Sequence, residues 1–317
     1  LSARMRRKMQ GVDHTMVEQL ERDYKAEKLV SFGADAVNQA RYLELYARCP
    51  VYTNTWTQYF PLGDHVFPVM LEELKRAERY IFLEYFIIGP GVFWDSIVEI
   101  LKEKHAAGVD VRIIYDDVGS LNTLPMNFAK KFEAETGIPC CFFNRFKPVI
   151  SIRMNNRDHR KFCIIDGHTA FTGGINLADE YINREMRFGH WKDSAILVKG
   201  EAAWSMTVMF LTMWEYVREV KVDYAALRPA GLPREAQLGS GYFVQPYTDN
   251  PLDNEAVGET VYLNLISKAE RYVYIMTPYL IISDCVNTAL CNAAKSGVDV
   301  RIMTPHIPDK PLVFEVT

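Results

Sequence analysis

The stretch from Asp158 to Asn176, DHRKFCIIDGHTAFTGGIN, combines residue types that suit phosphate chemistry. His159 and Lys161 are two residues apart, so both side chains fall on the same face of an extended strand. A neutral imidazole can attack phosphorus to form a covalent phosphohistidine, and a lysine is a point charge that binds phosphate. The pattern therefore predicts a phosphate site with a nucleophile; the alternative interpretation is a surface hairpin with charged ends.

The second half of this stretch predicts how the strand is held. Asp166–Gly167 is a strong hairpin signal, and Gly173 and Gly174 let a backbone come close to a ligand. Asn176 then supplies an amide donor for a developing oxyanion. Two such sets facing each other would catalyse phosphodiester exchange without a metal ion or cofactor, because a second histidine protonates the leaving alcohol.

The elements around this stretch form an internal repeat. RAERYIFLEYFII at 76–88 predicts a buried strand, and a helix at about 92–106 leads to the strand GVDVRIIYDD. Gly108–Arg112 (GVDVR) recurs identically at Gly297–Arg301, after the similar stretch KAERYVYIMTPYLII at 268–282. The recurrence predicts an α/β fold, a mixed sheet flanked by helices, duplicated in tandem.

The repeat also predicts the domain boundaries. We expect an N-terminal helical segment at 1–48, a first α/β domain at 49–226, a linker at 227–241 and the start of a second domain at 242–317. His159 lies 51 residues after Gly108, and the same offset from Gly297 falls at about position 348, beyond Thr317. We therefore expect the chain to be a fragment whose second copy is incomplete and lacks its own motif.

Composition narrows the class of protein. The 317 residues carry a net charge of −4, which gives no general attraction to nucleic acid. The six cysteines make no C-x-x-C pair, and most of them are expected to be small buried residues in a reducing compartment, so no metal site is predicted. No apolar run reaches the 18 residues of a membrane span. The basic cluster within LSARMRRKMQ at 1–10 suits either a juxtamembrane segment or a solvated helix start.

HRKFCIIDGHTAFTGGINLADEYI resembles the H-x-K-x4-D motif of the phospholipase D superfamily, and GHWKDSAILVKGEAAWSMTVMFLTMWEYV is similar to bacterial cardiolipin synthases. The resemblance implies that His159 is the nucleophile and that Asp166, the motif aspartate, is catalytic by family position but mostly architectural in its turn. Lys161, Gly174 and Asn176 would bind the substrate phosphate. Asp193 would hydrogen-bond His159 and fix its tautomer.

The same resemblance implies a function. The intact protein would be a phosphatidyltransferase that joins two phosphatidylglycerol molecules into cardiolipin, without a cofactor. Its partners would be phospholipid and the membrane surface, with the catalytic domain on the cytoplasmic side of a bacterial cell membrane and no span in this fragment. The second motif would come from the C-terminal part of the same chain.

Two other functions stay open at this point. One is hydrolytic: a phospholipase D, or a nuclease with a single motif that a dimer completes. The other is a lipid-binding scaffold that keeps the pocket but is not catalytic.

Further residues carry two interpretations each. Glu84, inside an apolar strand, needs a partner, and pairing with Arg112 is favoured over a role at the phosphate. Asp116 and Asp117 end a strand, where they contact a headgroup or cap a turn. His306 is expected in a loop at the end of a strand, near the rim of the site. A set of aromatic residues would line a lipid groove or, for most of them, belong to the core: Tyr85, Phe86, Phe142, Phe143 and Phe146.

Overall fold

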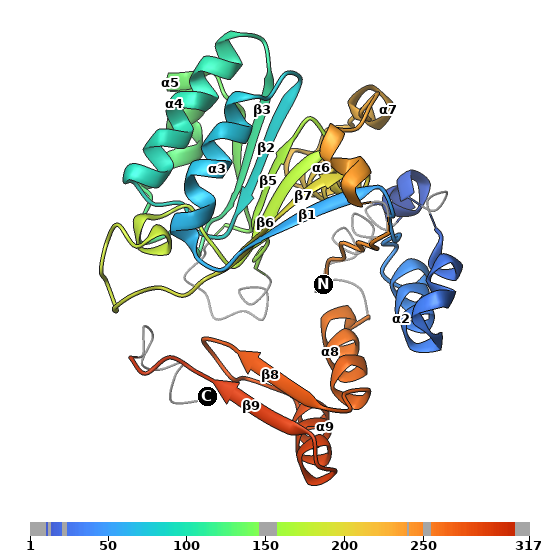
Figure 1. The fold of residues 1–317 in the computed structure, drawn as a ribbon. Coiled ribbons are helices and arrows are strands. Elements are labelled where there is room, and N and C mark those ends of the chain that lie inside the picture. Colours follow the sequence, from blue (N-terminus) through green and yellow to red (C-terminus); the bar gives the residue numbers. More distant parts are fainter. Residues whose placement is uncertain are drawn as a thin grey trace.

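A seven-stranded sheet is the centre of the computed structural model, which describes residues 11, 14–20, 24–145, 157–239, 241–249 and 255–307 (Figure 1). Its strand order is β1-β7-β6-β5-β2-β3-β4. The strands are β1 Thr55–Phe60, β2 Tyr80–Tyr85, β3 Asp110–Asp116, β4 Cys140–Phe143, β5 Phe162–Ile165, β6 Thr169–Gly173 and β7 Ala195–Gly200. β2, β3 and β4 are parallel and the other neighbours antiparallel, so the predicted mixed sheet is confirmed.

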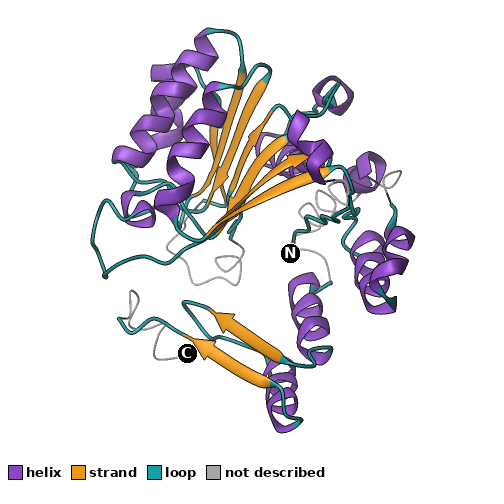
Figure 2. Cartoon of the chain, viewed as in Figure 1, coloured by secondary structure: helices purple, strands orange, loops and turns teal. Residues whose placement is uncertain are grey.

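Helices cover both faces of this sheet (Figure 2). Three of them pack on one face: α3 Gly63–Lys75, α4 Val92–Ala106 and α5 Phe128–Thr136. The opposite face is covered by α6, Ala202–Arg218. The α/β class predicted from the sequence is therefore confirmed.

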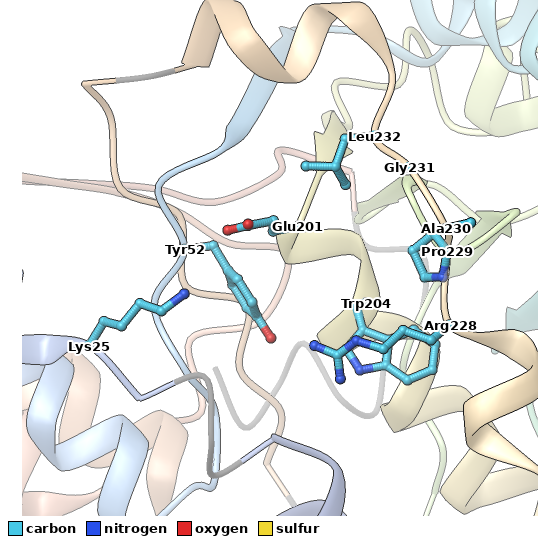
Figure 3. A pocket seen from close by; sticks show the side chains of 9 residues that line it. All are labelled: Lys25, Tyr52, Glu201, Trp204, Arg228, Pro229, Ala230, Gly231 and Leu232. Atoms are coloured by element: carbon cyan, nitrogen blue, oxygen red, sulfur yellow. The ribbon is translucent and has the colours of Figure 1, made fainter.

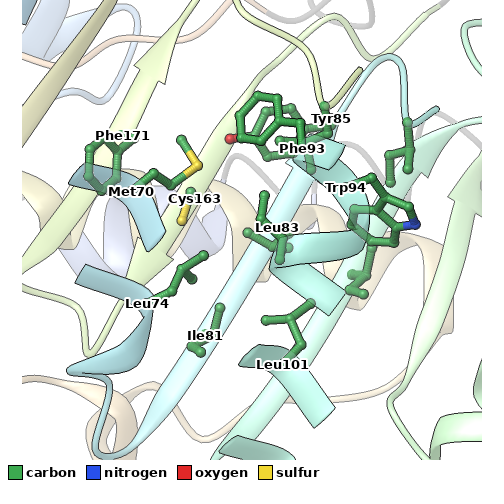
Figure 4. Packing of buried hydrophobic residues seen from close by; sticks show 14 of the residues in the cluster. Met70, Leu74, Ile81, Leu83, Tyr85, Phe93, Trp94, Leu101, Cys163 and Phe171 are labelled. Atoms are coloured by element: carbon green, nitrogen blue, oxygen red, sulfur yellow. The ribbon is translucent and has the colours of Figure 1, made fainter. Parts of the chain in front are cut away.

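The central strand β2 shows why this arrangement forms. All six residues of YIFLEY are buried, because β2 has strands on both sides and helices on both faces. Ile81 and Leu83 contribute to the core under α3 and α4, where Met70 and Leu74 of α3 pack with Leu101 of α4 (Figure 4). The alternate residues of β2 face α6, so one strand contributes to two cores.

The β5–β6 hairpin is closed by the predicted Asp-Gly turn. Asp166 and Gly167 have φ values of 53° and 72°, as a type I′ turn requires at its two central residues. The N–H of His168 donates to the carbonyl of Ile165 at 3.4 Å. The hairpin expectation is thus confirmed.

The predicted repeat is also present in the structure. β8 (Tyr272–Met276), α9 (Asp284–Lys295) and β9 (Asp299–Met303) repeat the order of β2, α4 and β3. The register is equivalent, since Tyr80 pairs with Asp110 in the first copy and Tyr272 with Asp299 in the second. In both copies the aspartate also forms an ion pair with the arginine two residues later.

The remaining described elements lie around these units. The N-terminal part is helical, with η2 (Ala26–Phe32) and α2 (Ala34–Leu45), and α2 packs against α8 (Val257–Ser267). Within the predicted linker, η5 (Arg234–Gly239) folds onto β1, after the short helix α7 (Tyr224–Leu227). The domain boundaries stay predictions. The basic cluster at residues 4–8 lies outside the described residues.

Candidate active site

His159 and Lys161 lie together just before β5, on the face of the sheet that α3 and α4 cover. The exposed imidazole of His159 is 4.7 Å from the ring of Phe86, measured between centroids. Lys161 is only 5% exposed, and its Nζ lies 5.5 Å from the same ring. Its Nζ also donates to the backbone carbonyl of His159 at 2.7 Å. The structure thus brings these two predicted residues together on one aromatic platform.

The buried environment of Lys161 lowers the pKa of its amine. Burial lowers the pKa of Lys161 to about 8, although Asp158, Asp193 and Asp116 act in the opposite direction. A buried ammonium that lacks full compensation gains most from an anion placed beside it. Lys161 is therefore suited to bind a phosphodiester.

Asn176 lies after β6, with its side chain held by the loop that follows β2. Its Oδ1 accepts the N–H of Ile87 at 3.0 Å, and the residue is buried. Its Nδ2 makes no hydrogen bond to any described residue. The amide is therefore oriented by its acceptor end, which leaves its donor end for a ligand.

The two glycines before Asn176 allow another segment of the chain to come close to the backbone. A Cβ atom at Gly174 would lie 1.9 Å from Oδ1 of Asp193, and one at Gly173 would lie 2.3 Å from the carbonyl oxygen of Ser194. The N–H of Gly174 already donates to that Ser194 carbonyl at 3.0 Å. These glycines admit the chain segment that carries Asp193, and contact between Gly174 and phosphate stays a prediction.

Asp193 lies against Gly174, and the charge of Lys161 acts on its carboxyl group. Burial raises the pKa of Asp193, while the charges of Lys161 and Lys192 act against this rise. Its Oδ1 accepts the N–H of Ser194 at 3.0 Å. Its predicted hydrogen bond to His159 stays a prediction.

Asp166, the last residue of the motif, lies at the other end of β5. Its carboxylate accepts the backbone N–H groups of Glu78, Arg79 and Tyr80, each at 2.8 Å. Five residue steps separate it from Lys161, or about 16 Å along an extended strand. Asp166 thus holds the turn to the start of β2, which agrees with the architectural role expected of it, and its place among the catalytic residues stays a prediction.

Asp116 and Glu84 are both held by contacts within the fold. Asp116 accepts the N–H groups of Val118 and Gly119, both at 2.9 Å, so it caps the turn after β3. Glu84 is ion-paired, but the expected partner was wrong: its Oε1 lies 2.7 Å from Nη2 of Arg160. Arg112 pairs instead with Asp110 on its own strand.

Most of the described aromatic residues in the expected set belong to the core or pack against it. Tyr85 and Phe143 belong to the core, and Phe142 packs against it. Phe86 differs because it supports His159 and Lys161. Phe146 lies outside the described residues.

The described residues form a small cavity beside Lys161 and a larger pocket away from it. The cavity has space of about 10 Å³ and is lined by Tyr85 and Thr172 among others. A pocket of about 220 Å³ lies elsewhere, between Lys25, Trp204 and Arg228 (Figure 3). Pro229 of this pocket packs near the turn at Gly167, at the opposite end of β5 from His159. The larger pocket therefore lies toward the Asp166 end of the motif, away from His159 and Lys161.

Three further findings concern the described part of the chain. His306 follows β9 in an exposed loop, as expected, and its place near the site stays a prediction. No described cluster of histidine, cysteine and acidic side chains is arranged to hold a metal ion. Within the same residues, every helix is too short or too polar to cross a bilayer.

Sequence comparisons agree with the motif. Residues 70–214 match the family described as "Cardiolipin synthase, PLD-like domain". An uncharacterized protein of Streptococcus mutans is 46% identical over 287 residues, or 90% of this chain and 61% of that protein. A cardiolipin synthase of Geobacillus thermodenitrificans is 34% identical over 269 residues, or 84% of this chain and 52% of that enzyme. The chain thus spans between half and two thirds of the length of these relatives.

A solved structure shares the fold. Phosphatidylserine synthase of Haemophilus influenzae is 12% identical, with a TM-score of 0.54 over 78% of this chain and 61% of that one. The fold and the motif together define a phospholipase D-like domain. The chain belongs to the phospholipase D superfamily, and its domain at residues 70–214 is of the cardiolipin synthase type.

Proposed function

We propose that this chain carries the nucleophile half of a phosphatidyltransferase that makes cardiolipin from two phosphatidylglycerol molecules. The observation that carries the proposal is the pair formed by exposed His159 and buried Lys161 on the ring of Phe86. The family match and the cardiolipin synthase relatives support the choice of substrate.

In the proposed first step, the imidazole of His159 attacks the phosphorus of one phosphatidylglycerol. A nitrogen–phosphorus bond forms and the bond to the glycerol headgroup breaks, so glycerol leaves with a proton from an acid. In the second step, the headgroup hydroxyl of another phosphatidylglycerol attacks the phosphohistidine and gives up its proton. The histidine is released unchanged and the product is cardiolipin.

Three residues would serve these steps around the phosphorus. Lys161 offsets the negative charge of the phosphoryl oxygens, and Nδ2 of Asn176 donates a hydrogen bond to one of them. Asp193 is proposed to fix the tautomer of His159. The acid that protonates glycerol is proposed to be a second histidine, from a motif outside the described residues.

The location of the reaction follows from its substrate. Phosphatidylglycerol is a membrane lipid, so we propose that the domain works on the bilayer surface, on the cytoplasmic side of a bacterial cell membrane. The proposal needs the phosphate and acyl groups of lipid to reach Phe86 and Lys161, which lie at one end of β5.

The test uses the full-length protein in vesicles that contain phosphatidylglycerol. His159→Ala is expected to lower cardiolipin formation by at least about 10³-fold, because no nucleophile remains. His168→Ala is the matched control at the other end of the hairpin, and its rate should stay within about twofold. Unchanged activity of His159→Ala contradicts the proposal.

Product analysis separates the two other functions. Mass spectrometry that finds phosphatidic acid in place of cardiolipin would favour a hydrolytic phospholipase D. Lipid binding without turnover in the wild-type protein would favour a scaffold.

A further inference from the structure

The residues on either side of His159 point to the opposite face of the sheet. His159 and Lys161 lie on the face that α3 and α4 cover, with Cys163 next in the same alternation. Asp158 and Arg160 therefore face α6, where Phe162 follows in the core. The chain at His159 thus carries the proposed phosphate site on one face, and the buried carboxyl of Asp158 with the partly buried guanidinium of Arg160 on the other.

Arg160 connects these buried groups. Its Nη2 lies 2.7 Å from Oε1 of Glu84, and its Nε lies 3.1 Å from Oδ1 of Asp158. Its Nη1 donates to the backbone carbonyl of Met209 in α6 at 3.3 Å. Glu84 is fully buried in β2, so one guanidinium links three elements of the fold.

The two carboxyl groups around Arg160 have pKa values that are shifted in opposite directions. Burial raises the pKa of Glu84 well above its usual range, against the charge of Arg160. Burial would also raise the pKa of Asp158, but Arg160 and the neighbouring Glu84 carboxyl bring it below its usual value. These directions favour a proton on Glu84 and a charge on Asp158, an arrangement in which the two carboxyl groups and Arg160 have no net charge.

A second set of contacts restrains the residues before His159. The N–H of Asp158 donates to Oδ2 of Asp116 at 3.0 Å. Nη1 of Arg157 lies 3.2 Å from Oδ1 of the same Asp116, and Nη2 donates to the carbonyl of Asn144 at 2.9 Å. Residues on both sides of His159 are therefore tied to β3 and β2, while its own ring is exposed.

We propose that Glu84, Asp158 and Arg160 are positioning residues that fix the backbone at His159, so that its imidazole meets the phosphorus in line. The inference rests on the proposed role of His159 as nucleophile. An exposed nucleophile needs such support, since a misplacement of about 1 Å can cost about 10²-fold in rate.

The test compares two substitutions of Glu84 in the full-length protein. Glu84→Gln keeps an acceptor for Arg160 and a donor toward Asp158, as a neutral glutamic acid does, so kcat should stay within about threefold of wild type. Glu84→Leu offers neither group, so kcat should fall by about 10–100-fold while KM changes less than about threefold. Rescue by glutamine and the change in kcat alone distinguish positioning from loss of substrate binding.

The matched control is a buried ion pair elsewhere on the sheet. Nζ of Lys199 lies 3.0 Å from Oε1 of Glu73 and 3.0 Å from Oε1 of Glu235, away from His159. Lys199→Met should destabilise the fold without changing kcat at a temperature where the variant is folded. A fall in kcat equal to that of Glu84→Leu would overturn the positioning role, because general destabilisation would explain both.

His159→Ala, assayed beside these variants, separates the two proposals. If it is inactive and Glu84→Leu keeps full kcat, positioning is overturned while the proposed function stands. An active His159→Ala overturns both. If Glu84→Leu does not fold, the double variant Glu84→Gln with Asp158→Asn takes its place. The double variant leaves Arg160 without an anion and should lose kcat, whereas Glu84→Gln alone should keep it; equal kcat in these two overturns the inference.

Discussion

The two ends of β5 carry the residues that the H-x-K-x4-D pattern joins, yet their surroundings differ. Before the strand, Lys161 is a buried amine whose pKa is lowered to about 8 by desolvation. After the strand, the carboxylate of Asp166 accepts three backbone N–H groups at 2.8 Å. One end keeps a charged group in need of an anion, and the other end satisfies its charge completely.

The difference explains the spacing of the motif, because the number of residues between Lys161 and Asp166 equals the length of β5. The four residues between Lys161 and Asp166 are β5 itself, Phe162–Ile165, and they alternate between the two cores of the sheet. The aspartate therefore fixes where the strand turns back, and the lysine marks where the strand reaches the site. Substitutions at the two ends should separate activity from stability.

The largest expected effect is at the site end. Lys161→Met should lower kcat/KM by about 10²–10³-fold, because no cation then faces the phosphate. It should not lower stability: the pKa of Lys161 is depressed in the folded state, so below pH 8 protonation favours the unfolded chain, by about 3 kcal/mol at neutral pH. Urea unfolding with vesicle assays measures both. Loss of stability together with activity would break the comparison.

At the turn end, Asp166→Ala should have the converse effect. Three backbone N–H groups lose a charged acceptor, so the free energy of unfolding should fall by about 3 kcal/mol. At a temperature where the variant is folded, kcat should stay within about threefold of wild type. A large fall in kcat with wild-type stability would show that Asp166 acts in the chemistry after all.

The pH dependence of kcat/KM tests the role of Lys161 directly. Lys161 binds phosphate as a cation, and its pKa of about 8 means that the charge is lost as pH rises above 8. The value of kcat/KM should therefore fall about tenfold between pH 8 and pH 9.3, as free-enzyme titrations do. Lys161→Arg, whose guanidinium stays charged, is the control and should show no fall in this range. An identical fall in both would assign the titration to another group.

The smallest effect is expected at Gly167 in the turn. Its φ is +72°, and a Cβ atom there would lie 2.2 Å from the hydroxyl of Tyr80. Gly167→Ala should lower the free energy of unfolding by about 1–2 kcal/mol and leave kcat unchanged, because the turn lies at the far end of the strand. Thermal unfolding and the vesicle assay check this, and a kcat effect would connect the two ends.

Much of this fold follows from local sequence. The β-branched and aromatic residues of YIFLEY and the glycine that precedes VDVR are short-range signals, and the two GVDVR copies adopt the same register against their partner strands. The Asp-Gly turn at Asp166 is equally local. For this reason the mixed sheet, the hairpin and the repeat were predictable.

The contacts that position the site depend on which strands are neighbours. Glu84 was expected to pair with Arg112, but Ile114 stands opposite Glu84 on β3 and Arg112 pairs with Asp110. Arg160 reaches Glu84 only because β5 lies antiparallel beside β2. Alternation in HRK places Arg160 opposite to the site, but the sequence does not say that β2 is its neighbour. The same holds for the approach of Asp193 to Gly174.

The unequal burial of the six thiols makes the rate of local opening measurable through their chemical reactivity. Cys285 and Cys291 are exposed on α9, while Cys49, Cys140, Cys141 and Cys163 are buried. Desolvation raises the pKa of all four buried thiols, to about 12 for Cys49 and Cys141, so they react only when the structure around them opens. A single alkylation time course should therefore show two rates, a fast one for the exposed thiols of α9 and a slow one for the four buried thiols, which is limited by local opening of the structure around them.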